Sequence, residues 1–298
     1  MKILVTGGVG FVGTNLIKRL LKDGDTVVCL DNYSTGKKEN EIEHENVHYI
    51  DVDISDSLRR HKAFGLEKYQ LEKPDIIYHM AALARIQPSI KNPVDCLENN
   101  FNGTLNILEY ARKYQIPVVY AGSSSKHHNL YGSPYAWSKY GGEELCKLYG
   151  NMYDVPSCIC RFYNVYGPYQ IEEGDYSTVI GIFERQYRNN EPLTITSDGE
   201  QRRDFTHIDD IVDGLIGCMR AMHGEVDMRF AGEEFELGRG ENFSINEIAD
   251  MFGKDYPRKY LDKRPGEYDS TLCTDTNAKE LLDWKPIVNL PDYIKEVK

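Results

Sequence analysis

The chain has no long apolar run, no excess of positive charge and no regular cysteine framework, and each absence excludes a class of proteins. Its 298 residues contain no stretch of about 18 apolar residues, so we expect no membrane span. A net charge of −12 argues against nucleic acid as a general partner. The seven cysteines are scattered and odd in number, which favours free thiols in a reducing compartment. The start, MKILVTGG, lacks the apolar region of a secretory signal, so we expect a cytoplasmic protein.

The sequence does contain an alternation of short apolar runs and amphipathic stretches. The runs predict strands at 2–7, 26–31, 47–54, 75–82, 117–124 and 157–167. Helical spacing predicts helices at 11–22, 93–115 and 135–150. Strands that alternate with helices of this length indicate an α/β protein with a Rossmann-type, doubly wound parallel sheet.

The pattern becomes less regular after residue 167. We expect a helix near 178–189, a strand at 192–196 and a helix at 207–223, followed by a mixture of short elements. No linker-like tract separates the two halves of the sequence. We therefore predict a sheet domain at 1–167, with a return from about 205–225, and a smaller mixed α/β C-terminal lobe at 168–298 that binds the substrate.

A glycine-rich turn joins the first predicted strand to the first helix. The segment GGVGFVG contains Gly7, Gly10 and Gly13. Missing side chains let a pyrophosphate approach the backbone, and the start of the helix provides free N–H groups and positive partial charge. The position of the turn between a strand and a helix favours a dinucleotide site over a simple tight corner.

Two acids follow at the ends of the next predicted strands. Asp31 comes 18 residues after Gly13, where a carboxylate can accept both hydroxyls of an adenosine ribose. It would repel a 2′-phosphate, so NAD is favoured over NADP. Asp53 closes the third strand and is a candidate contact for the adenine amino group.

Three tyrosines are followed by a lysine four residues later: Tyr33, Tyr69 and Tyr135. We expect the first two to face solvent, because they lie in a loop and near a helix end. Tyr135 and Lys139 instead share one face at the start of a helix that follows the fifth strand. The hydroxyl cluster 123–125 lies at the end of that strand, on the edge of the sheet where the glycine turn also lies.

The chemistry explains why this grouping matters. A free tyrosine has a pKa of about 10, so about 0.1% is phenolate at neutral pH. A nearby ammonium and a positive nicotinamide ring favour the phenolate. Lowering the pKa of Tyr135 by two or three, which corresponds to about 3–4 kcal/mol, would make this residue a usable base. We therefore predict that Lys139 activates Tyr135 and that a serine holds the sugar oxygen.

Taken together, the motifs resemble the extended short-chain dehydrogenase/reductases of the NAD-dependent epimerase/dehydratase family, typified by UDP-galactose 4-epimerase. The resemblance covers nearly the whole chain. The matching segments are TGGVGFVG (6–13), HMAA (79–82), NNFNGT (99–104), SSS (123–125), YAWSK (135–139), RFYNVYGP (161–168), QRRDFTHIDD (201–210) and RPGE (264–267).

The resemblance implies roles for individual residues. It implies Ser125, Tyr135 and Lys139 as the catalytic group. It implies the following contacts to NAD: Gly7, Gly10, Phe11, Val12, Gly13, Asp31, Asn32, Gly36, Asp53, Ile54, Ala81, Ala82, Asn99, Ser123, Tyr135, Lys139 and Phe162. It implies the following contacts to a nucleotide sugar: Arg85, Ser124, Ser125, Tyr135, Asn164, Val179, Leu193, Ile195, Arg203, Arg264 and Thr271.

Within the second set, the resemblance assigns Asn164, Arg203 and Arg264 to the substrate diphosphate. A planar guanidinium suits phosphate because it forms two parallel bonds. Val179, Leu193 and Ile195 fall where the family holds the nucleotide base. Thr271 or Leu272 takes the position that decides whether an N-acetyl group fits, and either is smaller than tyrosine.

The sequence also departs from the family pattern. The segment after Ser125 is short and contains His127 and His128, which either touch the sugar or cap the shortened loop; we favour a cap. They lack the further ligands of a metal site, and no metal is expected. Ala84 replaces a lysine found near the cofactor in some epimerases, so Arg85 either compensates or points at the substrate.

The same segment guides the choice of reaction. The family's 4,6-dehydratases carry an acidic pair directly after the catalytic hydroxyl, and its decarboxylases carry a glutamate there, whereas this chain has Lys126 and His127. We therefore predict a UDP-hexose 4-epimerase with permanently bound NAD, acting on glucose/galactose, their N-acetylated forms or the uronic acids. A 4,6-dehydratase, a 4-ketosugar reductase and a noncatalytic NAD sensor remain alternatives. Relatives often form homodimers through helices equivalent to 93–115 and 135–150, so we expect a homodimer.

Overall fold

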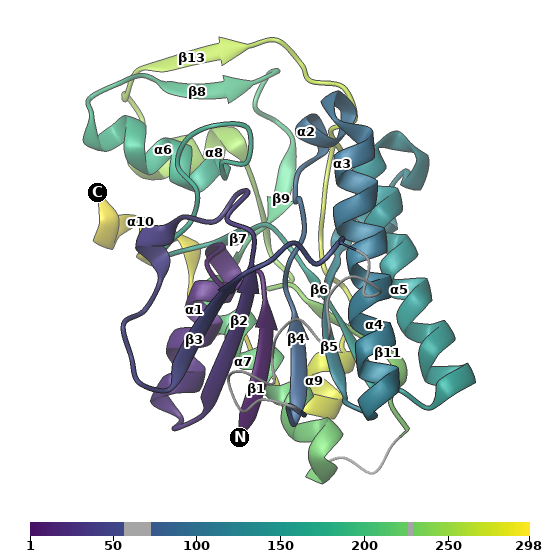
Figure 1. Cartoon of the computed structure of the whole chain (residues 1–298). Helices are drawn as coiled ribbons and strands as arrows, with labels where there is room; N and C mark the ends of the chain where they lie inside the picture. The colour runs from purple at the N-terminus through teal and green to yellow at the C-terminus, as the bar shows by residue number, and fades with distance from the viewer. Residues whose placement is uncertain (57–72, 226–228) are drawn as a thin grey trace.

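The computed structural model describes residues 1–56, 73–225 and 229–298. Its centre is a seven-stranded sheet in which every neighbouring pair of strands is parallel, in the order β11-β6-β5-β4-β1-β2-β3 (Figure 1). The strands are β1 (Lys2–Thr6), β2 (Thr26–Asp31), β3 (Val47–Asp51), β4 (Ile76–His79), β5 (Val118–Ser123), β6 (Ser157–Phe162) and β11 (Ala231–Leu237). The predicted α/β class and doubly wound sheet are confirmed.

Helices cover both faces of this sheet, as the predicted alternation requires. The α-helices are α1 (Phe11–Lys22), α2 (Ile86–Lys91), α3 (Pro93–Leu97), α4 (Gly103–Tyr114), α5 (Pro134–Tyr153), α6 (Val179–Arg188), α7 (Ile208–Arg220), α8 (Ile245–Phe252), α9 (Asn277–Leu282) and α10 (Leu290–Val297). The helix predicted at 93–115 forms as α3, a π-helical turn η3 (Glu98–Asn102) and α4. The other short helical segments are η1 (Lys38–Asn40), η4 (Ser124–His127), η5 (Leu130–Gly132) and η6 (Ala221–Glu225).

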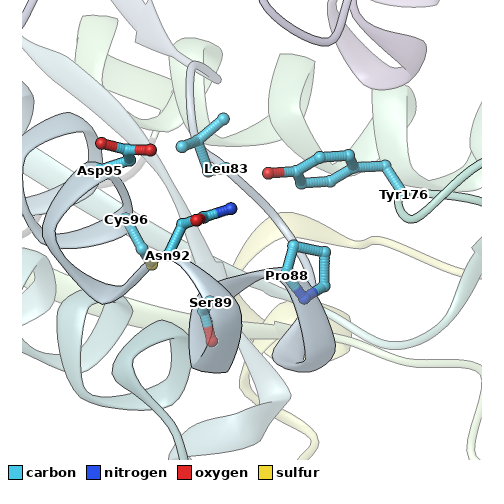
Figure 2. A pocket seen from close by; sticks show the side chains of 7 residues that line it. All are labelled: Leu83, Pro88, Ser89, Asn92, Asp95, Cys96 and Tyr176. Carbon is cyan, nitrogen blue, oxygen red and sulfur yellow. The ribbon is translucent and has the colours of Figure 1, made fainter.

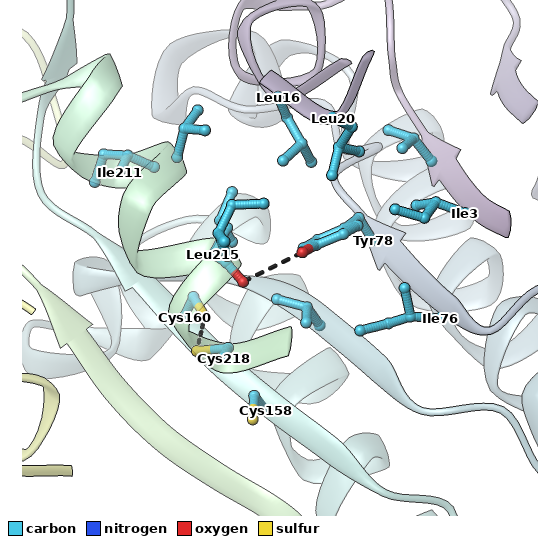
Figure 3. Packing of buried hydrophobic residues seen from close by; sticks show 14 of the residues in the cluster. Ile3, Leu16, Leu20, Ile76, Tyr78, Cys158, Cys160, Ile211, Leu215 and Cys218 are labelled. Atoms are coloured by element: carbon cyan, nitrogen blue, oxygen red, sulfur yellow. Dashed lines mark hydrogen bonds between the residues drawn. The ribbon is translucent and has the colours of Figure 1, made fainter. Parts of the chain in front are cut away.

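The side chains of alternate residues in each strand point to opposite faces of the sheet and pack into two separate hydrophobic cores. On one face, Ile3 and Tyr78 pack with Leu16 of α1 and Leu215 of α7, and the Tyr78 hydroxyl donates to the Leu215 carbonyl at 3.4 Å (Figure 3). On the other face, Leu4 and its neighbours pack against α4 and α5. This two-sided burial explains why the strands appear in the sequence as continuous apolar runs.

A third core belongs to a smaller lobe, which lies above the sheet in Figure 1. It packs α6, α8 and α10 around buried residues such as Phe183, Ile248 and Ile294. Three short strand pairs complete the lobe and its junction with the sheet: β8 (Leu193–Thr196) with β13 (Arg258–Leu261), β9 (Arg202–Asp204) with β12 (Asn242–Ser244), and β7 (Val165–Tyr166) with β10 (Thr206–His207).

The second half of the chain also contributes to the main sheet. β11 pairs with β6, and α7 packs in the first core. The division at residue 167 stays a prediction, but the sheet itself draws on both sides of that position. All seven cysteines are free and buried. No helix of the described ranges is long and apolar enough to cross a membrane.

Candidate active site

The predicted site residues follow the carboxyl ends of the central strands. β1 lies between β2 and β4, so the chain builds the sheet outward in opposite directions from this point. In doubly wound sheets, the crevice at such a reversal binds ligands. The loops after β1, β2, β4, β5 and β6 all carry predicted site residues to this edge.

Three glycines shape the turn between β1 and α1. Gly7 has a φ of 70°, and its amide donates to the Leu30 carbonyl at 2.8 Å. A Cβ on Gly7 would lie 2.7 Å from the backbone of Ala81, and one on Gly13 would lie 2.2 Å from the Gly7 oxygen. A Cβ on Gly10 would meet that oxygen only at 3.3 Å. Gly7 and Gly13 therefore fix the turn, while Gly10 keeps the start of α1 bare.

The first turn of α1 can bind an anion. Gly10 is the N-cap, and no side chain of the described residues caps this helix. The first amides of a helix have no partner inside it, so those of Phe11, Val12 and Gly13 are available to phosphate oxygens.

Asp31 lies beside this turn at the end of β2. Its Oδ2 accepts a hydrogen bond from the Val9 amide at 3.1 Å, and its Oδ1 accepts one from the Tyr33 amide at 2.9 Å. Burial raises the pKa of Asp31 above its ordinary value, and the two amide bonds oppose that rise. Each carboxylate oxygen retains acceptor capacity, which suits ribose hydroxyls.

The other residues predicted around the adenosine gather near Asp31. Asn32 donates to Asp53 Oδ2 at 2.9 Å, and the Asp53 carboxylate also accepts from Ser55. Ile54 is buried, and a Cβ on Gly36 would lie 2.6 Å from Val9 Cγ2. The bare helix start and the acid at the end of β2 together fit the ADP-ribose part of NAD.

A buried hydrogen-bond chain that sequence reasoning missed supports the crevice from below. The Ala81 amide donates to Thr6 Oγ1 at 3.2 Å, and Thr6 Oγ1 bonds His79 Nδ1 at 2.7 Å. His79 Nε2 bonds Thr104 Oγ1 at 2.9 Å, and that hydroxyl donates to the Asn100 carbonyl at 2.6 Å. Because the Thr104 hydroxyl donates its proton to the Asn100 carbonyl, His79 donates from Nε2 to Thr104 Oγ1. Burial and the charge of Lys139 lower the pKa of His79 to about 3, so the ring is neutral and accepts at Nδ1 from the Thr6 hydroxyl.

The π-helical turn η3 places Asn100, rather than the predicted Asn99, in the interior. Asn100 is 1% exposed, and its Oδ1 accepts from the Leu83 amide at 2.7 Å while its Nδ2 donates to Ser138 Oγ at 3.0 Å. Asn99 is half-buried, and its cofactor role stays a prediction. Asn100 instead fixes the segment after β4 to the helix that carries Tyr135.

Tyr135 lies in the first turn of α5 with its hydroxyl at the end of β5. The hydroxyl donates to Ser123 Oγ at 3.3 Å. Ser125 Oγ donates to the same oxygen at 2.8 Å. The catalytic role of Ser125 stays a prediction: Ser123, predicted for the cofactor, is the hydroxyl that touches the phenol, and Ser125 lies one hydrogen bond further away.

Lys139 is buried beneath this group. It is 4% exposed, and its Nζ lies 4.3 Å from the centre of the Tyr120 ring. Burial lowers the pKa of Lys139 to about 8, although nearby Glu143 opposes this. The ammonium therefore lies over the Tyr120 ring.

The charge of Arg85 also acts on Tyr135, and the predicted activation of Tyr135 by Lys139 stays a prediction. Burial raises the pKa of Tyr135, and the hydrogen bond to Ser123 and the charge of Arg85 oppose that rise. Arg85 Nε donates to the carbonyls of Tyr176 and Ser177 at 3.2 and 3.3 Å. This arginine is the N-cap residue of α2.

The residues predicted for the diphosphate lie on the small-lobe side. Asn164 Nδ2 donates to the Asp204 carbonyl at 2.9 Å and to Thr271 Oγ1 at 3.2 Å. Burial lowers the pKa of Arg203, against the charges of Glu267 and Asp269. Arg264 is exposed. Their contacts to a diphosphate stay predictions.

The residues predicted for the base and the N-acetyl group differ in exposure. Leu193 and Ile195 are fully buried in the core of the small lobe, so their side chains present no surface to a ligand. Val179 is half-buried at the start of α6. Thr271 is 5% exposed and Leu272 is 46% exposed, so only the second offers a free side chain. The base site stays a prediction.

The remaining predicted residues line the same edge. Phe162 ends β6 and is half-buried, and Ala82 and Ser124 are half-buried in the segments after β4 and β5. Tyr33 is also half-buried, and its hydroxyl donates to Glu41 at 2.5 Å rather than facing solvent as expected. Tyr69 lies outside the described residues.

A buried ionic network, which was not predicted from the sequence, lies behind the serine cluster. The Arg161 side chain is 2% exposed and bonds Glu143 Oε2 at 2.8 Å, Glu234 Oε1 at 2.7 Å and Glu236 Oε1 at 2.7 Å. Glu143 has no exposed surface, and its Oε1 accepts from the Ser123 amide at 3.4 Å. The network therefore supports the strand end that positions Ser123.

The two histidines occupy different environments. His127 Nε2 bonds Glu236 Oε1 at 2.7 Å, so its ring joins the ionic network, and its role as a cap of the shortened loop stays a prediction. His128 stacks on Tyr268, with ring centroids 4.0 Å apart, and the charge of Arg203 adds to the burial that lowers its pKa. His128 thus lies toward the predicted substrate side.

A small hollow of about 30 Å³ opens beside the crevice (Figure 2). It is lined by Leu83, Pro88, Ser89, Asn92, Asp95, Cys96 and Tyr176. Its volume is that of about one water molecule, so it cannot hold a sugar.

The comparisons with known proteins agree with this geometry. The model of the NAD dependent epimerase/dehydratase family matches residues 3–230. The chain therefore belongs to this family, and the resemblance inferred from its motifs is confirmed.

Three relatives illustrate the range of the family. The putative UDP-glucose 4-epimerase of Methanocaldococcus jannaschii is 31% identical over 316 residues, which cover 99% of this chain and 96% of that protein. UDP-glucuronic acid decarboxylase 4 of Arabidopsis thaliana is 33% identical over 328 residues, which cover 100% of this chain and 69% of that protein. The crystal structure of UDP-glucuronic acid 4-epimerase from Bacillus cereus, in complex with UDP-glucuronic acid and NAD, has a TM-score of 0.85, is 30% identical and covers 100% of both chains.

Proposed function

We propose that the chain is an NAD-dependent UDP-hexose 4-epimerase. The observation that carries this proposal is the hydrogen bond between the Tyr135 and Ser123 hydroxyls, at the sheet edge that also bears the glycine turn. A phenol at that position can reach a carbinol held between the cofactor and the small lobe. The similar proteins named as UDP-sugar 4-epimerases support the substrate class.

Each site residue has a definite task in this reaction. Bound NAD supplies the reversible two-electron oxidation of C4. Tyr135 accepts the proton of the C4 hydroxyl and later returns it, while Ser123 and Ser125 hold the sugar oxygen in line. Arg85 and the buried Lys139 provide the positive charge that favours the phenolate. Asn164, Arg203 and Arg264 hold the diphosphate, so the hexose can turn while the nucleotide stays bound.

The residues after Ser125 favour epimerisation over elimination. Lys126 Nζ bonds Glu234 Oε1 at 2.8 Å, and the segment carries no carboxylate of its own. A second candidate remains because His127, bonded to Glu236, is an ionisable group only two positions after Ser125. If, after oxidation at C4, His127 removed the C5 proton while the C6 hydroxyl left as water, and the hydride then returned to C6 with a proton to C5, the product would be a 4-keto-6-deoxy sugar.

A product assay tests the proposal. The purified protein is incubated with UDP-glucose, UDP-N-acetylglucosamine and UDP-glucuronate, and the products are identified by NMR. We expect a C4 epimer from at least one of them, with a rate lowered about 1,000-fold in Tyr135→Phe. Tyr131→Phe, at a tyrosine that is 88% exposed, is the matched control.

The outcomes separate the candidates. A 4-keto-6-deoxy product would replace epimerase with dehydratase, and net consumption of reduced cofactor would indicate a reductase. Full turnover by Tyr135→Phe, or no turnover of any UDP-hexose by the wild type, would end the proposal.

We also propose that the protein acts as a homodimer in the cytoplasm. Large side chains on α3 and α5 are exposed, at Val94 (62%), Trp137 (40%), Leu148 (50%) and Met152 (65%). Apolar surface of this kind on adjacent helices suits a second copy. Leu148→Glu combined with Met152→Glu should yield monomers in light scattering, and an unchanged mass would contradict this interface. The seven free, buried thiols suit a reducing compartment.

A further inference from the structure

The loop that follows β13, residues 264–271, is fixed to the protein at both of its ends, and we call it the strap. Near its start, the Pro265 carbonyl accepts a hydrogen bond from Gln87 Nε2 of α2 at 2.6 Å. Near its end, the Asp269 carbonyl accepts a hydrogen bond from the Arg202 amide of β9 at 2.9 Å. Figure 1 shows the chain leaving β13, crossing toward α2 and returning beside β9.

The two ends of the strap lie beside the groups predicted to bind the two ends of the sugar. The helix α2, which binds Pro265, is also bonded to the start of α5, because the Tyr135 amide donates to Ser89 Oγ at 3.2 Å. At the other end, Thr271 Oγ1 accepts from Asn164 Nδ2 at 3.2 Å. A hexose with C4 at Tyr135 and its diphosphate at Asn164 would therefore lie between the two ends of the strap.

One pair of side chains joins the middle of the strap to the short segment after Ser125. The rings of His128 and Tyr268 are stacked, with centroids 4.0 Å apart and planes 19° from parallel. The His128 amide donates to the Ser125 carbonyl at 3.1 Å, which fixes this histidine to the hydroxyl cluster. Burial raises the pKa of Tyr268, the charge of Tyr135 adds to that rise and the charge of Arg203 opposes it. The Tyr268 ring is therefore within electrostatic reach of both sides of the crevice.

The stack is a contact that can open. The strap backbone lies against η5, since a Cβ on Gly266 would lie 3.4 Å from the Gly132 oxygen. No hydrogen bond of the His128 or Tyr268 side chain is found among the described residues. An aromatic pair changes an equilibrium by about 10-fold at most, so its loss frees the strap without unfolding the protein.

We propose that the His128–Tyr268 stack is a latch that holds the strap closed over the sugar and keeps the 4-keto intermediate in the site. The proposal rests on the proposed 4-epimerase function. Once C4 is oxidised and its hydroxyl proton has passed to Tyr135, the ketose must turn before the hydride and the proton return. A sugar that is free to turn is also free to leave unless the site is closed. Each ketose that leaves early strands one reduced cofactor on the enzyme. His128 and Tyr268 are thus positioning residues.

The stranded cofactor provides the test. The holoenzyme is given the UDP-hexose that it epimerises fastest, and we measure reduced nicotinamide absorbance and free 4-ketosugar, trapped with borodeuteride, per turnover. Tyr268→Leu and His128→Leu each remove one ring and should raise both quantities about 10-fold. Tyr268→Phe keeps the stack and should behave like the wild type. The double Leu variant should be no worse than either single one, because the two rings form one contact.

A tyrosine of the same segment provides the matched control. Tyr131 is 88% exposed, and Tyr131→Leu should leave both quantities at the wild-type level. Unchanged accumulation in the two single Leu variants, or additive effects in the double variant, would overturn the latch. So would a Tyr268→Phe as defective as Tyr268→Leu, because the hydroxyl rather than the ring would then be the active group. Melting temperatures show whether each variant folds, and if one ring variant does not, the other decides.

Failure of the latch is distinguishable from failure of the proposed function. Stopped-flow displacement measures the release of UDP-glucose in the Tyr135→Phe background, where no chemistry is needed. Release about 10-fold faster after Tyr268→Leu supports the latch, and an unchanged rate overturns it. A wild type that turns over no UDP-hexose overturns the 4-epimerase but leaves this measurement valid, whereas a protein that binds no UDP-glucose overturns both.

Discussion

The two sides of the crevice differ in whether their polar groups already have partners. On the cofactor side, Asp31 accepts two amide bonds and His79 is bonded at both ring nitrogens. On the substrate side, Arg85, Arg203 and Arg264 have no carboxylate within 4.0 Å among the described residues. The first side is complete once the chain has folded, whereas on the second side we expect the charges of a ligand to complete the pairing.

This difference separates stability from binding. Removing a group from the complete side should leave its partners buried and unsatisfied, which lowers the free energy of unfolding. Removing an unpaired cation should weaken substrate binding and leave stability unharmed. Four sets of variants test the comparison.

The largest effect on stability is expected for a paired cation. Arg161→Met leaves the fully buried Glu143 without its partner and should lower the free energy of unfolding by about 3–5 kcal/mol in a urea titration. Arg188→Met, which breaks the exposed pair with Glu172, should have a far smaller effect. Equal losses would show that burial of the network does not matter.

An unpaired cation should behave in the opposite way. Arg203→Met should raise KM for a UDP-hexose about 100-fold, because it removes the contact that we predict to the diphosphate, and should not lower the free energy of unfolding. The adjacent Arg202 bonds Asn242 at 2.9 Å and Glu247 at 2.9 Å, so Arg202→Met should cost stability and spare KM. If the two variants exchanged these results, the comparison would be wrong.

On the cofactor side, two glycines of the turn allow an effect on stability to be separated from an effect on NAD binding. Gly13→Ala would place a Cβ 2.2 Å from the Gly7 oxygen and should cost about 1–3 kcal/mol of stability. Gly10→Ala meets its nearest atom at 3.3 Å, so it should keep the melting temperature and reduce NAD occupancy, measured after denaturation of the purified protein. A normal melting temperature for Gly13→Ala would mean that the turn can rearrange.

The smallest expected effect is a change in how the free energy of unfolding depends on pH. Burial, with the charge of Lys139, lowers the pKa of His79 from 6.5 to about 3. Between these values the unfolded chain binds one more proton than the folded one, so stability falls as the pH falls from 6.5, by up to about 1.4 kcal/mol per unit. His79→Gln removes this titration and should flatten the profile between pH 6.5 and 5. An unchanged slope would assign the pH dependence to other groups.

Local patterns in the sequence predicted the cofactor side well. The apolar runs located six strands of the sheet, and the glycine spacing located the turn. Each of these patterns involves only residues close together in the sequence, so it can be recognised without knowledge of distant contacts. The position of Asp31 at the end of β2 followed from the same local reasoning.

The substrate side was harder to predict from the sequence, because its contacts join segments that lie far apart in the chain. A positive charge that acts on Tyr135 comes from Arg85, fifty residues earlier, and the Nζ of Lys139 lies over the Tyr120 ring. The seventh strand, β11, was not predicted, because Glu233, Glu234 and Glu236 hide its alternation. Two of these glutamates are bonded to Arg161 on the neighbouring strand, a pairing that the sequence alone does not reveal.

The position of β11 has a consequence for synthesis of the protein on the ribosome. The edge of β6 is finished at residue 162, but the strand that covers it ends 75 residues later, at residue 237. At ordinary translation speeds this leaves an open strand edge on the nascent chain for roughly 4 to 15 s. Open edges of this kind pair readily with other chains, so early termination products ending near residue 167 should aggregate or require a chaperone.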